Sequence, residues 1–390
     1  MGARLRVVAM VASAILLVAA VVAVARGAAS HTTPTVAAAS RRSRASAPSM
    51  PSSTTSSAPP AASAAPTTQR STTTASTTST TVPNPYSGAA PIGPVVLTGC
   101  PPATKPPPLT PPSHPSVLVP ESALPTPPTP AARVKNLSAI SGKGMFIWEA
   151  NLTDGGNVAA IVRQATAAGL HQVWVRVGSS FDGFYGQTFL AALVPALHRV
   201  GIAVIGWGFP YLYDPVGDVV WTREALEWRA PNGQGLDGWG ADIETGSEGT
   251  ALSGKRALTY LGLVRPYMAG RPLVAIVYPP TSYWLANYPY QAMVPYIDAF
   301  APMLYWSCVE PGADALMALK ALGGLAPLHL IGQAYDMGPY GGRDGSPSGP
   351  EIARFLDVAR RGGAVGASFW VWQDTTAPEW SALTGYRWTG

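Results

Sequence analysis

Two acidic residues, Asp242 and Glu244, have the types and the spacing that could do chemistry in this sequence. They end a strand-like run, 236–244, and stand one position apart. Alternate side chains of a β-strand point to the same face, so the two carboxyls would share a face and Ile243 would point away. Each carboxylate raises the pKa of its neighbour, which can keep one of them protonated near neutral pH. The spacing therefore predicts a general acid; the alternative is a buried ion-pair network with Arg176.

The elements that must position this pair alternate regularly from residue 144 onward. Apolar strand-like runs are separated by stretches of helical periodicity, such as 154–168, which ends at Gly169. We expect the strands near 145–149, 173–177, 203–207, 236–244, 273–278, 297–305, 328–333 and 365–372. Eight such units in about 250 residues predict a closed (β/α)8 TIM barrel. No Gly-rich dinucleotide fingerprint follows the first run, which argues against a Rossmann fold.

Aromatic and polar residues gather at the ends of these expected strands, where a TIM barrel carries its active site. Flat aromatic faces stack on sugar rings and polar groups bond the hydroxyls, so this pattern predicts a mouth that binds a sugar chain. Trp174 and Trp207 are expected to fill the core instead. The alternative role for Asp336 is to cap a loop. The alternative role for Glu149 is to form an ion pair with Arg176. The substrate-binding candidates are Trp148, Glu149, Arg176, Tyr278, Trp306, Gln333, Asp336, Trp370 and Trp372.

The first third of the chain has a different composition. Residues 1–30 predict a signal peptide, because a basic start precedes an apolar run, or a membrane anchor formed by residues 7–25. Residues 31–135 are rich in Ser, Thr, Pro and Ala and predict a disordered low-complexity stalk that precedes the barrel of residues 136–390. Two short runs, 95–100 and 117–119, are apolar enough to pack on the barrel. Either N-terminal option places the rest of the chain outside the cytoplasm, secreted or anchored to the membrane or cell wall.

The net charge and the histidine content limit the classes of ligand and partner that we expect for this protein. The formal net charge is +5, and several of the arginines lie in the N-terminal tail rather than on one clustered face. Nucleic-acid binding is therefore not expected. The 5 histidines are scattered without ligand spacing, so we expect no metal and no other cofactor. We expect a monomer whose partner is a polysaccharide.

The chain has 2 cysteines, Cys100 and Cys308. An even number in an exported protein permits one disulfide, and two free thiols are the alternative. Cys308 follows the expected sixth strand, so a bond to Cys100 would hold the end of the stalk beside the mouth.

The run 236–244, Leu-Asp-Gly-Trp-Gly-Ala-Asp-Ile-Glu, resembles the fourth-strand signature of family 18 glycoside hydrolases, the chitinase-like barrels. That signature is Asp-Gly-x-Asp-x-Asp-x-Glu, and Asp237, Gly238, Asp242 and Glu244 match it. The run 301–306, Ala-Pro-Met-Leu-Tyr-Trp, resembles the family's sixth-strand motif, and Trp370 or Trp372 resembles its last-strand tryptophan. A weaker resemblance links the Asp-x-Glu pair to the family 25 lysozyme-like barrels.

The resemblance implies roles for three residues. Glu244 would be the general acid that protonates the glycosidic oxygen. Asp242 would orient the substrate's 2-acetamido group, whose carbonyl oxygen acts as nucleophile, and Tyr305 would support the same group. The departure is Gly240, which stands where the family has an Asp that interacts with the residue matching Asp242.

These observations predict an exported glycoside hydrolase that acts on N-acetylated polysaccharide, either peptidoglycan or chitin-like. Gly240 motivates a second hypothesis, a barrel that binds glycans without cleaving them. A third is a cell-surface interaction domain displayed on a stalk.

Overall fold

The computed structural model describes residues 90–101 and 117–389. The expected signal peptide or anchor, including residues 7–25, and most of the expected stalk lie outside the described residues. Within the described ranges, no helix has the length and apolar character needed to cross a membrane.

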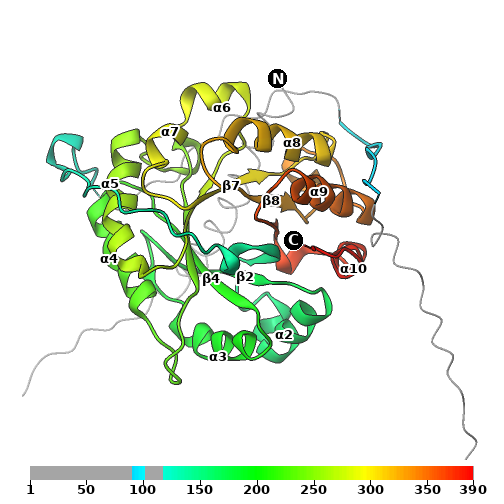
Figure 1. Ribbon diagram of the computed structural model, residues 1–390, viewed down its shortest axis with the longest axis horizontal. Helices are drawn as coiled ribbons and strands as arrows, with labels where there is room; N and C mark the ends of the chain where they lie inside the picture. The colour runs from blue at the N-terminus through cyan, green and yellow to red at the C-terminus, as the bar shows by residue number, and fades with distance from the viewer. Residues whose placement is uncertain (1–89, 102–116, 390) are drawn as a thin grey trace, which may run out of the picture. The chain divides into compact units, whose positions relative to one another are not determined.

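A closed barrel of parallel strands forms the centre of the fold (Figure 1). The strand order is β1-β9-β8-β7-β6-β5-β4-β2, and pairing of β1 with β2 closes the ring. The short strand β3 (Gly183–Phe184) pairs antiparallel with the end of β2 and lies outside the barrel. The barrel strands are β1 (Gly142–Ile147), β2 (Gln172–Ser179), β4 (Ala203–Phe209), β5 (Gly238–Asp242), β6 (Leu273–Val277), β7 (Ala299–Leu304), β8 (His329–Gln333) and β9 (Gly366–Trp370). The predicted (β/α)8 fold is confirmed.

Helices surround the strands and bury their outer faces (Figure 1). Nearly every strand residue is buried, as parallel strands covered on both faces require. The helices are α2 (Val158–Ala167), α3 (Gln187–His198), α4 (Pro215–Glu227), α5 (Gly254–Val264), α6 (Ser282–Asn287), α7 (Tyr290–Met293), α8 (Pro311–Leu322), α9 (Gly349–Arg361) and α10 (Ala377–Gly385).

Helix α4 has a well-defined start at Pro215. The Asp214 side chain accepts a hydrogen bond from the Val216 N–H, and Pro215 occupies the first turn. An acidic N-cap followed by Pro is a strong helix start because both satisfy or avoid unpaired N–H groups. The helix therefore starts at this pair.

Two segments from the expected stalk pack on the barrel. In residues 90–101, the Ile92 N–H donates to Asp357 on α9, at 2.9 Å. In residues 117–135, the Val119 N–H donates to the Tyr213 carbonyl at 3.0 Å, and Lys255 and Ser253 at the start of α5 hold Glu121. These segments form part of the folded unit.

Asp298, which is 1% exposed, joins three parts of the chain just before β7. Its carboxylate pairs with Arg265 and accepts hydrogen bonds from the N–H groups of Val134 and Leu273, at 2.7 and 2.8 Å. Arg265 also donates to the Ala132 carbonyl at 2.9 Å. One buried carboxylate thus fixes the segment 132–134 to β6 and β7.

We predict that Asp298→Ala lowers the free energy of unfolding by about 3–5 kcal/mol, because it leaves a buried guanidinium and two N–H groups unpaired. Denaturant titration measures the change. The matched control is Glu227→Ala, which breaks an ion pair whose two side chains are each 52% exposed and should cost under about 1 kcal/mol. Equal losses for the two variants would contradict this account.

Candidate active site

A pocket opens at the carboxyl ends of the barrel strands, and we call it the mouth pocket. Both Asp242, at the end of β5, and Glu244 line it, so the two carboxyls do share a face. Ile243 between them is fully buried on the opposite side. The lining residues are Phe146, Trp148, Arg176, Trp207, Phe209, Asp242, Glu244, Ile276, Met303, Tyr305, Ile331 and Trp370.

The two carboxyls are deeply buried. Asp242 is 6% exposed and Glu244 is 1% exposed. Within the described part of the chain, Oδ1 of Asp242 and both carboxyl oxygens of Glu244 have no hydrogen-bond partner. Buried polar atoms without partners are costly and uncommon, and they concentrate where a ligand or reaction uses them.

This burial shifts the acidity of both groups. Loss of solvation raises the pKa of Asp242 to about 7, although the Arg176 charge opposes the shift. Burial also raises the pKa of Glu244 well above its ordinary value, and the charges of Asp242 and Glu248 add to this effect. A carboxyl that keeps its proton at neutral pH can act as a general acid.

Arg176, on β2, lines the pocket without closing an ion pair. Its guanidinium carbon lies 5.7 Å from the ring centroid of Trp207, within the range of a cation–π contact. Among the described residues, no carboxylate lies within ion-pair distance of Arg176, neither Asp242 and Glu244 nor Glu149. The alternative of a structural ion-pair network is therefore not found.

Aromatic rings form one side of the pocket. Trp370 is only half-buried, and its ring centroid lies 5.8 Å from that of Trp148 and 5.4 Å from that of Trp207. Phe146 packs below, 6.0 Å from Trp370. Trp148 and Trp370 thus present a partly open aromatic surface at the rim, which is the kind that sugar rings stack on.

A second layer of side chains fixes the acidic segment from behind. The Tyr288 hydroxyl donates to the Ile243 carbonyl at 2.5 Å. The Thr245 hydroxyl lies 2.8 Å from Oε2 of Glu248 and 3.5 Å from the hydroxyl of Tyr278. Tyr278, a predicted site residue, is therefore buried beside the acids rather than at the open mouth.

Glu248 is a third buried carboxyl, 1% exposed, that our sequence reasoning missed. It forms a capping box with Thr245 at a short 3-10 helix, Gly246–Glu248. The signal was present, because Thr245 followed three residues later by Glu is the capping-box pattern.

The structure brings some predicted site residues together and separates others. Tyr305 lines the mouth pocket with Asp242 and Glu244, whereas Glu149 does not line it. Asp336 lies on a separate groove and accepts hydrogen bonds from the N–H groups of Gly338 and Gly345, which agrees with a loop-capping role.

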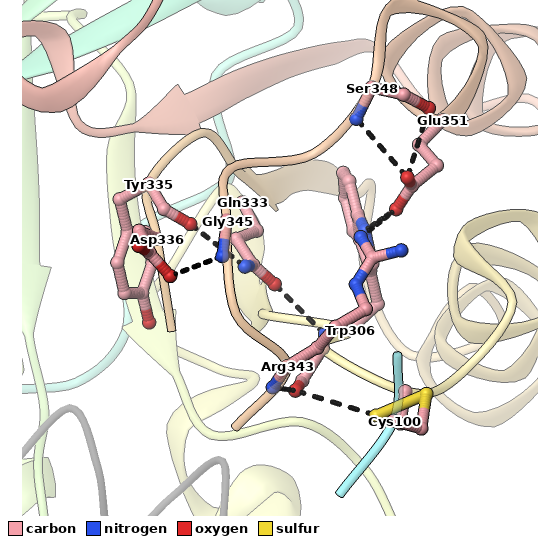
Figure 2. Close-up of polar contacts among 11 residues, drawn as sticks. Cys100, Trp306, Gln333, Tyr335, Asp336, Arg343, Gly345, Ser348 and Glu351 are labelled. Carbon is pink, nitrogen blue, oxygen red and sulfur yellow. Dashed lines mark hydrogen bonds and ion pairs between the residues drawn. A yellow bond between two sulfur atoms is a disulfide. The ribbon is translucent and has the colours of Figure 1, made fainter. Parts of the chain in front are cut away.

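Three predictions for the mouth need correction. Trp306 is fully buried away from the pocket and donates to Glu351 at 3.0 Å (Figure 2). Trp372 faces α10 and donates to Asp154 at 3.2 Å. Gln333 is 1% exposed and bonds the Ser307 N–H and the Tyr335 carbonyl. Alternation explains Trp306, which directly follows Tyr305. Trp372 and Gln333 stand two positions after the lining residues Trp370 and Ile331; Trp372 begins a 3-10 helix beyond β9, and the loops that follow β7 and β8 hold Gln333.

Cys100 and Cys308 are bonded, with their Cα atoms 5.7 Å apart (Figure 2). Cys308 lies in the loop after β7, one residue from Ser307, whose hydroxyl accepts a hydrogen bond from the Arg343 N–H at 2.9 Å. The bond therefore holds the segment 90–101 to the loops around the mouth.

Gly240 faces the barrel interior, and its surroundings explain the departure from the family signature. A Cβ atom at this position would lie 3.0 Å from a ring carbon of Trp174 and 3.0 Å from Cδ1 of Ile276. Trp174 is fully buried and stacks on Phe146 at 5.0 Å. An aromatic ring thus fills the space that an aspartate side chain would need.

The mouth pocket is narrow. Its cavity volume is about 20 Å³, room for little more than one water molecule. A whole sugar ring therefore has to rest on the rim, and only a small group can reach the carboxyls without side-chain movement. Among the described residues, no cluster of three or more His, Cys, Asp or Glu could hold a metal ion.

No protein-family model matches this sequence, and no curated protein matches it. Solved structures do. The spore cortex-lytic enzyme SleL of Bacillus cereus is 11% identical, with a TM-score of 0.49 over 64% of this chain and 75% of that one. A chitinase of Chromobacterium violaceum is 12% identical, with a TM-score of 0.48 over 63% and 98%. The family 18 chitinase ChiB of Flavobacterium johnsoniae is 11% identical, with a TM-score of 0.47 over 63% and 92%.

The barrel is similar to those of family 18 chitinases and SleL. At these sequence identities, the similarity concerns the fold alone. The roles of individual residues have to be argued from the geometry of this chain.

We predict that Asp242→Asn stabilises the protein at high pH. Because folding raises the pKa of Asp242 to about 7, the native state holds a proton that the unfolded state releases near pH 4, so stability falls as pH rises between these values. The variant has no carboxyl to titrate at this position. Its free energy of unfolding should therefore exceed that of wild type by about 2–4 kcal/mol at pH 8 and by little at pH 4. Thermal unfolding at both pH values measures this. The control is Asp344→Asn at an exposed position, which should change the free energy of unfolding by less than about 0.5 kcal/mol.

We also predict that Gly240→Asp lowers the free energy of unfolding by about 3 kcal/mol or more, since it crowds Trp174 and buries a charge. Gly324→Asp is the control, because a Cβ there meets no atom within 4 Å. A folded Gly240→Asp variant as stable as this control would show that the interior has room for the family's aspartate.

Proposed function

We propose that this protein is an exported glycoside hydrolase that cleaves N-acetylated polysaccharide. The observation that carries the proposal is the pair of buried carboxyls, Asp242 and Glu244, that line one pocket beneath an aromatic rim. The apolar run of residues 7–25 supports export.

Glu244 acts as the general acid in this proposal. Its raised pKa keeps the proton that the leaving glycosidic oxygen must accept when the bond to the sugar breaks. Asp242 accepts a hydrogen bond from the N–H of the substrate's acetamido group and turns the carbonyl oxygen towards the sugar C1. That oxygen attacks C1 as the glycosidic bond breaks, and a water molecule then opens the cyclic intermediate, as in substrate-assisted glycosidases.

The remaining lining groups assist this chemistry. Tyr305 is 3% exposed, and burial raises its pKa well above the ordinary value, with smaller contributions from Tyr335, Asp242 and Glu244. Its hydroxyl therefore stays a proton donor near the acetamido group. Trp148 and Trp370 hold the sugar ring at the rim. Arg176 keeps a positive charge beside Asp242 as that group ionises.

Gly240 and the narrow pocket favour a second candidate, a barrel that binds glycans without cleaving them. Both candidates use the same aromatic rim. They differ only in whether Glu244 transfers its proton.

Turnover of N-acetylglucosamine oligomers and of peptidoglycan by wild type and Glu244→Gln tests the proposal. The variant should lose about 10²–10⁴-fold in kcat and keep its affinity, because the amide cannot donate a proton as the acid does. Glu224→Gln, on the exposed face of α4, should retain full activity. Sugar binding by the wild type without turnover would favour the second candidate, and absence of both would contradict the two together.

A further inference from the structure

A second, larger hollow lies beside the mouth, and we call it the rim groove. It has a cavity volume of about 880 Å³ and runs between the β8–α9 loop, residues 334–348, and the start of α10. Tyr335, Asp336, Tyr340 and Ser346 line one side, and Asp374 and Thr376 line the other. A volume of this size accommodates a ligand of several rings.

The groove is joined to the mouth pocket by a line of tyrosines. Tyr305, which lines the pocket, packs edge-on against Tyr335 with ring centroids 5.6 Å apart. Tyr335 in turn lies 6.2 Å from Tyr340. Tyr305 and Tyr335 are 3% and 6% exposed, so these two rings form the wall between the hollows, and the groove lies directly beside the mouth pocket.

The loop that forms one wall is built rigidly (Figure 2). Arg343 pairs with Glu351 at the start of α9, and Ser348 bonds the same carboxylate at 2.9 Å. The Asp336 carboxylate accepts a hydrogen bond from the Gly345 N–H at 2.8 Å, which ties the two ends of this loop segment together. The groove is thus a preformed surface, since contacts to the buried side chains of Arg343 and Glu351 and to the Gly345 backbone hold its wall.

The charged side chains that line the groove are all acidic. Asp336 and Asp374 both reach its surface, and among the described residues that line it none is Lys, Arg or His. Tyr335 is 6% exposed, and its hydroxyl has no hydrogen-bond partner among the described residues. The wall therefore offers carboxylates, hydroxyls and tyrosine rings, a set that suits a polyhydroxylated ligand carrying a positive charge.

We propose that the rim groove binds the part of the polysaccharide that extends from the mouth, and that it selects sugar units bearing a free amine over units bearing a carboxylate. This inference rests on the proposed function for the identity of the ligand as a glycan. In chemical terms, the preferred substrate is a partly de-N-acetylated glucosamine polymer. Its ammonium groups lie near Asp336 and Asp374, while an acetylated unit occupies the mouth.

The test measures binding of three tetrasaccharides to the full chain carrying Glu244→Gln, which prevents hydrolysis. The probes are a mixed glucosamine and N-acetylglucosamine tetramer, the fully acetylated tetramer, and a tetragalacturonate. The comparison variant adds Asp336→Asn and Asp374→Asn. The Asp336→Asn substitution keeps the side-chain oxygen that accepts hydrogen bonds from the Gly338 and Gly345 N–H groups. An unchanged melting temperature verifies that the substitutions leave the loop folded.

We expect the amine-bearing tetramer to bind the parent about fivefold to tenfold more tightly than the double variant, which matches the loss of two exposed charge contacts. The difference should shrink at high salt, because exposed charges are screened. The acetylated tetramer should change less than about twofold, and the tetragalacturonate should bind the variant better than the parent.

Equal affinity of the amine-bearing tetramer for both proteins would overturn the groove assignment, whatever the enzyme's activity. Conversely, a charge preference that the double variant abolishes supports the groove even if wild type hydrolyses nothing. The two proposals therefore fail separately.

Discussion

The burial of two carboxyls at the end of β5 without a counterion is the constraint on which the rest of the site depends. Removing a carboxylate from water costs several kcal/mol unless partners replace the solvent. Here Arg176 stands near Asp242 but packs over Trp207 rather than forming an ion pair. The protein meets the cost by letting the carboxyls keep their protons, and this protonation is the property that general acid catalysis needs.

Buried carboxyls of this kind require a surrounding backbone that cannot rearrange to expose them to water. The barrel supplies that frame, because each strand end is held by two neighbours and by helices behind. Tyr288 and the Thr245–Glu248 capping box fix the backbone on either side of Glu244. The buried carboxyls thus lie where neighbouring hydrogen bonds and strand pairing hold the backbone most firmly.

The alternation of apolar runs and helical stretches was enough to predict the barrel, and the strict two-residue period of a strand was enough to predict that Asp242 and Glu244 share a pocket. The same period failed beyond strand ends. Trp306 directly follows the mouth-facing Tyr305 and turns outward to Glu351, whereas Trp372 begins a 3-10 helix beyond the end of β9 and donates to Asp154. Glu248 and the tyrosines behind the acids come from turns and from segments distant in sequence, whose packing no local pattern specifies. The sequence could not explain why glycine stands at position 240, because the reason is the packing of Trp174 into the space that an aspartate would occupy.

The bond between Cys100 and Cys308 has a consequence for the order of events in synthesis. The two residues are 208 positions apart, so the first thiol leaves the ribosome long before its partner exists. It must stay unpaired until the chain through β7 has been made, and six barrel strands are then available to fold. Closing so long a loop restricts the unfolded chain by on the order of 5 kcal/mol in the chain-entropy account. The bond therefore cannot form until six of the eight barrel strands have been synthesised, and it then needs an oxidising compartment to form and persist.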